Sequence, residues 1–288
     1  MWMSDSTLAS FLLPDGFSRP AVAAVLREGS LVTEAGRYAL HRVGDRRARR
    51  STPYAGRAAA WAGRTADPVL LVPGFMAGDS SLSLMARALR ERGFRVYRSH
   101  IHANIGCTSD AAALLEARLE SIAKRRGSRV QIVGHSLGGM LARGVAVRRP
   151  DLVSGIVTLG SPMLAPGAHH RALTAGVDVL VRLSRAGVPG LMAQECVGGT
   201  CAQQSWDESR EPVPAAVGFT AIYSKRDGIV DWRACVDPGA RPVEVRASHI
   251  GMAVDPRVLD HVTDALRRQC RAVVDRSSVV EVDCGESA

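Results

Sequence analysis

The most regular feature of the chain is an alternation of short apolar runs with longer stretches of helical periodicity, which begins near Pro68. The first run, residues 69–72, is apolar at every position and ends at Pro73-Gly74. Such a run predicts a strand that is covered on both faces. Further strands are predicted at residues 94–97, 130–133, 153–159, 219–223 and 243–245.

Helical patterns fill most of the intervals between these strands. Apolar residues recur at spacings of three and four in residues 82–92. Residues 109–126 open on Ser109 and Asp110, which can cap a helix, and stop at Gly127. Further helices are predicted at residues 140–149, 171–185 and 256–271. Strands that alternate with helices of this length need crossover connections, so we predict an α/β fold with a mainly parallel sheet and helices on both faces.

Two segments interrupt the alternation. Residues 1–66 show no strong period, and we treat them as an N-terminal segment of uncertain structure. Residues 163–214 separate two consecutive strands by far more than an ordinary loop, which predicts a cap or lid insertion. The core is then expected to comprise residues 67–162 and 215–288 as one main domain.

The composition fits a globular protein, with 46% hydrophobic and 23% charged residues. The formal net charge is +9, but the basic residues are spread along most of the chain without a recognition motif, so we predict no nucleic-acid partner. The densest basic run, residues 41–57, is interpreted as a solvated loop, with an anion-binding patch as the alternative. The start of the chain lacks the features of a secretory signal, and no apolar run is long enough for a bilayer, so we expect a cytoplasmic protein. Loose contact with a membrane surface stays open, and the sequence does not fix the oligomeric state.

Six cysteines lack the paired spacing and the nearby histidines of a zinc site, so no metal is predicted. Cys196 and Cys201 bracket a flexible Val-Gly-Gly-Thr turn, which would let their sulfurs meet. A local disulfide and two free thiols are both compatible with this spacing. The six cysteines are Cys107, Cys196, Cys201, Cys235, Cys270 and Cys284.

The clearest chemical motif is the pentapeptide from Gly134 to Gly138, which reads Gly-His-Ser-Leu-Gly between a predicted strand and a predicted helix. In this context G-x-S-x-G indicates a sharp turn that exposes a nucleophilic serine, here Ser136. The glycines remove side chains that would clash at such a turn. Because a hydroxyl is a weak nucleophile at neutral pH, Ser136 needs a positioned base.

His249 is the base that remains after elimination. In hydrolases with this motif the acid and the histidine follow the serine in the chain. His169 and His170 lie in the predicted cap before any suitable acid, and His261 falls within the last helix. His249 follows the predicted strand 243–245 in a loop.

Asp227 is the preferred acid because it lies directly after the strand 219–223, where side chains are held firmly. Asp231, four residues on, is its rival. An acyl-transfer enzyme also needs N–H donors for the oxyanion. We assign these to the backbone of Leu137, directly after the nucleophile, and of Phe75, in the loop after the first strand.

These motifs together resemble a lipase/esterase branch of the α/β-hydrolase superfamily, similar to triacylglycerol lipases, over roughly residues 66–271. The resemblance rests on five segments: Val72-Pro-Gly-Phe75, Gly134-His-Ser-Leu-Gly-Gly139, Thr158-Leu-Gly-Ser-Pro162, Ser224-Lys-Arg-Asp-Gly-Ile-Val-Asp231 and Ser248-His-Ile-Gly251. It implies the α/β-hydrolase fold, a small-molecule or lipid ester as substrate, a role in lipid metabolism, and no cofactor. The chain departs from such lipases at Pro73, where they commonly carry histidine.

The sequence therefore predicts a serine carboxylic-ester hydrolase with Ser136, Asp227 and His249 as its triad. An acyltransferase with the same triad and a catalytically silent binding protein are the alternatives. Apolar residues of the predicted cap would either receive an acyl chain or only pack the cap to the core, and the pattern does not separate the two. They are Leu164, Val177, Val179, Leu180, Leu183, Val188, Leu191 and Met192.

Overall fold

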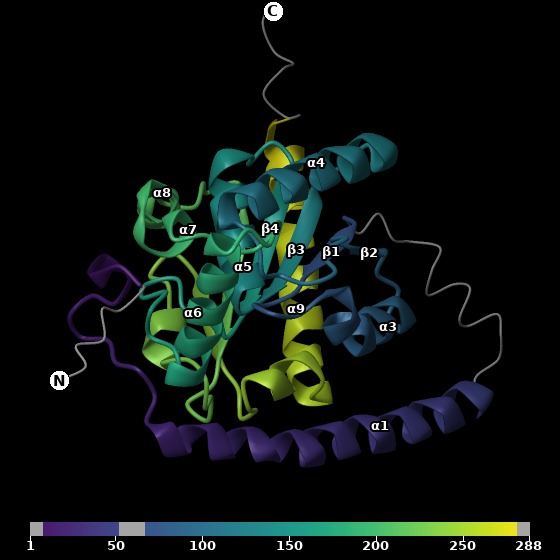
Figure 1. Cartoon of the computed structure of the whole chain (residues 1–288). Coiled ribbons are helices and arrows are strands. Elements are labelled where there is room, and N and C mark those ends of the chain that lie inside the picture. The colour runs from purple at the N-terminus through teal and green to yellow at the C-terminus, as the bar shows by residue number, and fades with distance from the viewer. Residues whose placement is uncertain (1–7, 52–66, 281–288) are drawn as a thin grey trace, which may run out of the picture.

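The structure, a computed structural model, describes residues 8–51 and 67–280, with only the backbone described for residues 44–51 and 270–280 (Figure 1). The described residues form one sheet of six strands in the order β2-β1-β3-β4-β5-β6, and every neighbouring pair is parallel. The strands are β1 (Val69–Val72), β2 (Val96–Arg98), β3 (Val130–His135), β4 (Val153–Leu159), β5 (Gly218–Tyr223) and β6 (Arg241–Glu244). The predicted parallel α/β architecture is confirmed.

Helices cover both faces of the sheet, so there are two hydrophobic cores. Successive residues of a central strand belong alternately to one core and to the other. Val69 and Leu71 of β1 pack with α3 (Ser83–Glu91) and α9 (Pro256–Val280). Leu70 and Val72 pack with α4 (Thr108–Arg126) and α5 (Leu137–Arg148) on the other face. The unbroken apolar run in β1 follows from this double cover, because a strand between two helical layers has no solvated side.

The predicted boundaries differ mainly at the ends of elements. α5 begins at Leu137 instead of Met140, because the turn at Ser136 leads directly into the helix. α9 continues to Val280, beyond the predicted end at residue 271. The two edge strands, β2 and β6, are partly exposed, so their apolar patterns mark their ends poorly.

The N-terminal segment carries more structure than its sequence pattern predicts. It contains η1 (Ser10–Leu12), the 3-10 helix η2 (Val22–Ser30) and the long helix α1 (Leu31–Ser51), which passes along one side of the core (Figure 1). The prediction of a basic loop for residues 41–57 is wrong as far as residue 51, which lies in α1. Arginine is a good helix former, and charged helices lack the apolar period on which the prediction relied. Residues 52–57 lie outside the described residues.

Three helices occupy the long interval between β4 and β5: α6 (Arg171–Arg185), α7 (Glu195–Gly198) and α8 (Thr200–Arg210). They gather on one side of the molecule (Figure 1), where α8 contacts α4 and α5. A small apolar cluster joins Val177 and Val181 of α6 to Met192 and Val197, with Phe75 packed against it. Across the described residues, no helix is both long enough and apolar enough to pass through a bilayer.

Candidate active site

Ser136 occupies the sharp turn between β3 and α5, with φ 52° and ψ −122°. Such a positive φ is strained for a residue with a side chain, and strain of this kind concentrates at functional sites. The Ser136 N–H donates to Leu159 O at 2.8 Å, which fixes the turn to the neighbouring strand β4. The serine therefore lies at the start of α5, where the helix dipole favours negative charge.

The turn is closely packed. A Cβ placed on Gly138 would lie 2.2 Å from the carbonyl oxygen of Val72, so only glycine fits where α5 crosses the end of β1. A Cβ on Gly74 would lie 3.0 Å from the Ser136 Cβ. The loop after β1 thus lies directly against the nucleophile candidate.

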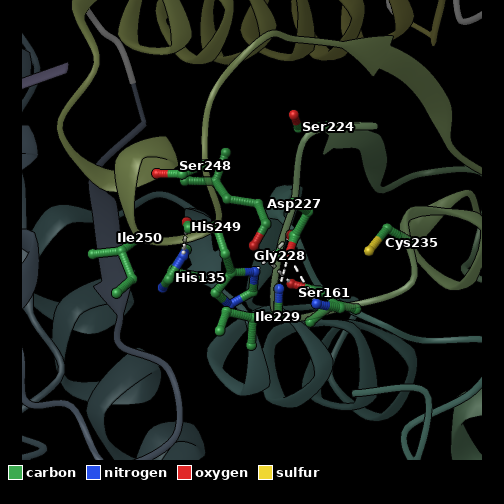
Figure 2. Close-up of polar contacts among 12 residues, drawn as sticks. His135, Ser161, Ser224, Asp227, Gly228, Ile229, Cys235, Ser248, His249 and Ile250 are labelled. Atoms are coloured by element: carbon green, nitrogen blue, oxygen red, sulfur yellow. Dashed lines mark hydrogen bonds and ion pairs between the residues drawn. The ribbon is translucent and has the colours of Figure 1, made fainter. Parts of the chain in front are cut away.

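Asp227, in the loop after β5, and His249, in the loop after β6, meet through a short hydrogen bond. His249 Nδ1 and Asp227 Oδ2 are 2.7 Å apart, and both residues are buried (Figure 2). The other oxygen of Asp227 accepts the N–H groups of Ile229 and Val230, each at 2.8 Å. Ser224 also ties the two loops, because its hydroxyl donates to Ala247 O at 2.6 Å.

Asp231, the rival acid, is used elsewhere. It forms an ion pair with Arg233 at 2.6 Å and accepts the Ser18 N–H at 3.1 Å. The carboxylate in contact with His249 is therefore Asp227.

His135 and His249, whose rings lie close together, have opposite pKa shifts. Burial alone would lower the pKa of His249, but the charge and hydrogen bond of Asp227, with a contribution from Glu28, leave it above its usual 6.5. Burial and the adjacent His249 lower the pKa of His135 to about 4. The His135 ring lies 4.9 Å from that of His249 between centroids, and its Nε2 lies 2.9 Å from the His249 carbonyl oxygen. His135, the residue before Ser136, thus connects the loop of His249 to the turn at Ser136.

Among the described residues no hydrogen bond joins the Ser136 hydroxyl to His249. Catalytic hydrogen bonds of this type often tighten only when substrate is bound. The three other histidines that follow Ser136 in the chain lie elsewhere: His169 lines the cavity described below, His170 caps α6, and His261 lies in α9.

The N-terminal segment supplies two glutamates that the sequence reading did not single out. One Glu28 oxygen accepts the N–H groups of Gly228 and His249, each at 3.0 Å, and the other accepts Ile250 N–H at 3.0 Å. Glu34 is buried, and it accepts the backbone N–H and the hydroxyl of Ser248 at 2.8 Å and 2.6 Å. Glu28 therefore bridges the loop of Asp227 and the loop of His249.

The loop from Pro73 to Ala77 presents its backbone toward the same place. Met76 has φ 56° and donates its N–H to Asn104 O at 3.0 Å, while Ala77 N–H donates to Gly74 O at 3.2 Å. Neither bond uses the Phe75 N–H. The buried Asn104 also donates its side-chain amide to Pro73 O at 3.0 Å, a second support that the sequence reading missed. On the other side, Leu137 is the first residue of α5, so its N–H has no acceptor within the helix.

A cavity of about 380 Å³ opens beside Ser136, Phe75 and Leu137. Its apolar lining comes from the N-terminal segment, α5 and the segment between β4 and β5: Leu12, Met140, Val177, Met192, Val197 and Trp206. Of the apolar set predicted for the cap, Val177 and Met192 line this cavity, whereas Val179, Leu183 and Val188 are exposed.

Comparison with known proteins decides the family. Residues 69–287 match the alpha/beta hydrolase family. The chain belongs to this family. Among solved structures, this hydrolase is similar to the mature form of a lipase from Bacillus licheniformis, with a TM-score of 0.57 and 16% identity over 70% of this chain and 93% of that one. It is also similar to lipase B of Aspergillus fumigatus, with a TM-score of 0.51 and 16% identity over 72% of this chain and 54% of that one. At such identities the likeness shows a shared fold.

Proposed function

We propose that this hydrolase cleaves carboxylic esters through an acyl-enzyme on Ser136. The observation that carries the proposal is the hydrogen-bonded pair of Asp227 and His249 at the same sheet edge as a serine with φ 52°. A buried acid–histidine pair beside a nucleophile turn is the arrangement that acyl transfer requires. Ester-cleaving chemistry also agrees with the two lipases whose fold it shares.

The contact between Asp227 and His249 supports the following roles. His249 Nε2 takes the proton of Ser136 as the hydroxyl oxygen attacks the ester carbonyl carbon. Asp227 keeps the proton on Nδ1 and stabilises the imidazolium that forms, through the 2.7 Å contact. His249 then passes its proton to the leaving alcohol, and a water molecule activated by the same base releases the acid.

The oxyanion is assigned to the backbone N–H groups of Phe75 and Leu137. Both residues line the cavity next to Ser136, and the chain on either side of them is fixed by hydrogen bonds or by helix α5. Two donors held in place before reaction stabilise the charge that develops in the transition state without reorganising.

The proposed substrate is a small-molecule or lipid ester with an apolar acyl part. The cavity of about 380 Å³ is lined mostly by apolar side chains, and it falls within the range of small-ligand sites. We propose that residues 163–214 act as the cap of this cavity, because α6 and α8 supply part of its wall. In this proposal Val177 and Met192 contact the acyl part.

Replacing the nucleophile tests the proposal. Ser136→Ala should lower the hydrolysis of a p-nitrophenyl ester by roughly 10⁴-fold or more, because the covalent route is lost. Circular dichroism should show an unchanged fold. The matched control is Ser154→Ala: Ser154 is buried in β4 and its hydroxyl has no partner among the described residues, so activity should persist.

Two further measurements separate the alternatives. A fluorophosphonate should label the wild-type chain at Ser136 and fail to label Ser136→Ala; a chain that is never labelled would be a silent binding protein. Faster transfer of the acyl group to an added alcohol such as glycerol than to water would make the protein an acyltransferase instead. If Ser136→Ala kept full hydrolytic activity, neither the hydrolase nor the acyltransferase mechanism on Ser136 would stand.

A further inference from the structure

Three cysteines from distant parts of the chain converge beside the cavity. The Sγ atoms of Cys107, Cys196 and Cys201 all lie within 4.8 Å of one another, and those of Cys107 and Cys201 are 3.6 Å apart. All three are free thiols, so of the two alternatives that the sequence left open for Cys196 and Cys201, the structure has the free thiols. Cys107 and Cys201 are 94 positions apart in the chain, which is why cysteine spacing did not reveal the cluster.

The three cysteines come from two regions of the fold, the core and the segment between β4 and β5. Cys107 directly precedes α4, in the core, while Cys196 belongs to α7 and Cys201 to α8. Near Cys107, Ile105 O accepts the Met192 N–H at 2.8 Å. This bond holds the segment that precedes Cys196 against the core.

The short loop between Cys196 and Cys201 is also fixed. Glu195 accepts the backbone N–H and the hydroxyl of Thr200, at 3.0 Å and 3.3 Å, and so closes the turn that joins α7 to α8. The thiols therefore stand on elements whose relative positions are set by other contacts, which is what a preformed ligand set requires.

The distances suit a shared metal ion. A zinc ion lies about 2.3 Å from each thiolate in a tetrahedral site, which places neighbouring sulfurs roughly 3.8 Å apart. The Cys107 and Cys201 sulfurs are 3.6 Å apart and no pair of the three exceeds 4.8 Å, so only small movements are needed to reach that value. A disulfide would instead need two sulfurs to approach to about 2.05 Å and an oxidant to accept two electrons.

We propose that Cys107, Cys196 and Cys201 form a binding site for one thiophilic d¹⁰ cation, Zn²⁺ being the ion to test. Each thiol gives up its proton to solvent as the sulfur binds the ion. The Ser109 hydroxyl, 3.1 Å from Cys201 Sγ, supports that sulfur by a hydrogen bond, as partners beyond the ligands commonly do.

Such an ion would fasten α7 and α8 to the start of α4. Cys196 lines the cavity together with Ser109 and Ser136, so the site stands at its wall without involving the triad. The role is structural, and it does not depend on whether Ser136 is a nucleophile.

Metal titration of the whole chain tests this site. Reduced, zinc-free protein without a polyhistidine tag should take up one Zn²⁺ in competition with a chromophoric chelator, and its thermal midpoint should rise. Co²⁺ in place of Zn²⁺ should give the near-ultraviolet charge-transfer band of thiolate ligands. Ser136→Ala should bind zinc as the wild type does.

Serine variants identify the ligands. Cys107→Ser, Cys196→Ser and Cys201→Ser should each weaken zinc binding by roughly 100-fold or more, a loss at least as large as those seen for partners beyond the ligands. Cys235→Ala is the matched control, because Cys235 is a buried thiol in a separate apolar cluster. It should bind zinc normally.

A measurement on the unaltered chain covers the case in which a variant fails to fold. Zinc should slow alkylation of Cys107, Cys196 and Cys201 by iodoacetamide at least tenfold, mapped by mass spectrometry. The proposal is overturned if zinc leaves these rates unchanged, if no thiolate band appears with Co²⁺, or if the reduced protein binds no zinc. A folded Cys201→Ser variant with full zinc affinity would overturn it as well.

Discussion

Asp227 serves two purposes with its two carboxylate oxygens. Oδ1 accepts two backbone N–H groups and so fixes its own loop, while Oδ2 contacts His249. Burial lowers the pKa of His249, and the negative charge of the Asp227 carboxylate is the main cause that raises it above its usual value. The Asp227 side chain thus both contacts the His249 ring and raises its pKa.

This arrangement predicts a particular pH dependence. His249 must be neutral to take a proton, so kcat/KM should fall as the pH drops through the His249 pKa, with a midpoint above the usual 6.5. Asp227→Asn removes the charge that raises this pKa, so the midpoint should move to lower pH. Turnover should drop by about 10⁴-fold, because the amide no longer holds the imidazole in the required tautomer.

Asp231→Asn is the control for this prediction. Asp231 pairs with Arg233, so its loss should leave the pH midpoint in place. If the pH midpoint moved in Asp231→Asn and not in Asp227→Asn, the assignment of Asp227 as the acid would be wrong.

The sequence identifies the candidate triad because its members stand at strand ends in a fixed order, which local patterns can reveal. It does not reveal Glu28 or Glu34. Their partners in the loops of Asp227 and His249 lie 200 or more positions away, as in the contact between Glu28 and His249. A glutamate in a segment without apolar periodicity also looks like a solvated surface residue.

Among the elements, η2 and the start of α1 brace the loops that carry Asp227 and His249. Glu28 of η2 accepts three backbone N–H groups, and Glu34 of α1 accepts two groups of Ser248. Carboxylates form strong, charge-assisted hydrogen bonds, so these contacts hold the loops more firmly than neutral acceptors would.

Glu28→Gln tests the brace. The variant keeps the size of the side chain but loses its charge and one acceptor oxygen, so kcat/KM should fall by about 10- to 100-fold through misplacement of His249. The pH midpoint of activity should also move down, because Glu28 contributes to the raised pKa of His249. A purely structural role would lower stability without moving that midpoint.

The matched control is Glu120→Gln. Glu120 forms an exposed ion pair with Arg149 on the outside of α4, so its loss should change neither kcat/KM nor the pH midpoint.

For the whole molecule, the buried histidines make stability depend on pH. Burial lowers the pKa of His135 and of His169 to about 4, whereas a histidine in the unfolded chain titrates near 6.5. Below pH 6.5 the unfolded chain therefore binds more protons than the folded one at these two positions. The raised pKa of His249 acts in the opposite direction, but its contribution is already complete below 6.5.

Denaturant unfolding between pH 6.5 and 5 should show the effect. The free energy of unfolding should fall with a slope that steepens below pH 6.5 toward a limit of about 1.4 kcal/mol per pH unit for each of the two histidines. His169→Gln should remove about half of this slope, whereas a change of the exposed His102 to Gln should leave it intact. A stability that stays flat over this range would contradict the prediction.

The sequence predicts the sheet and its helices well, because a strand between two helical layers shows an unbroken apolar run and amphipathic helices show their period. It predicts the N-terminal segment poorly. α1 is rich in charged residues, and the side chains that anchor this segment, Glu28 and Glu34, are polar. The pattern of apolar residues therefore predicts neither the helix nor its contacts. The cysteine cluster escapes for a related reason, since it depends on how α7 and α8 are folded back on α4.

The recognisable hydrolase region and the working unit do not begin at the same residue. Family likeness starts at residue 69, yet the carboxylate that joins the acid loop to the histidine loop sits at residue 28. A chain trimmed to the family boundary would keep every triad side chain while releasing the clamp between two of them. An inactive truncated protein would then say nothing against Ser136, so activity assays should be made on a chain that retains Glu28 and Glu34.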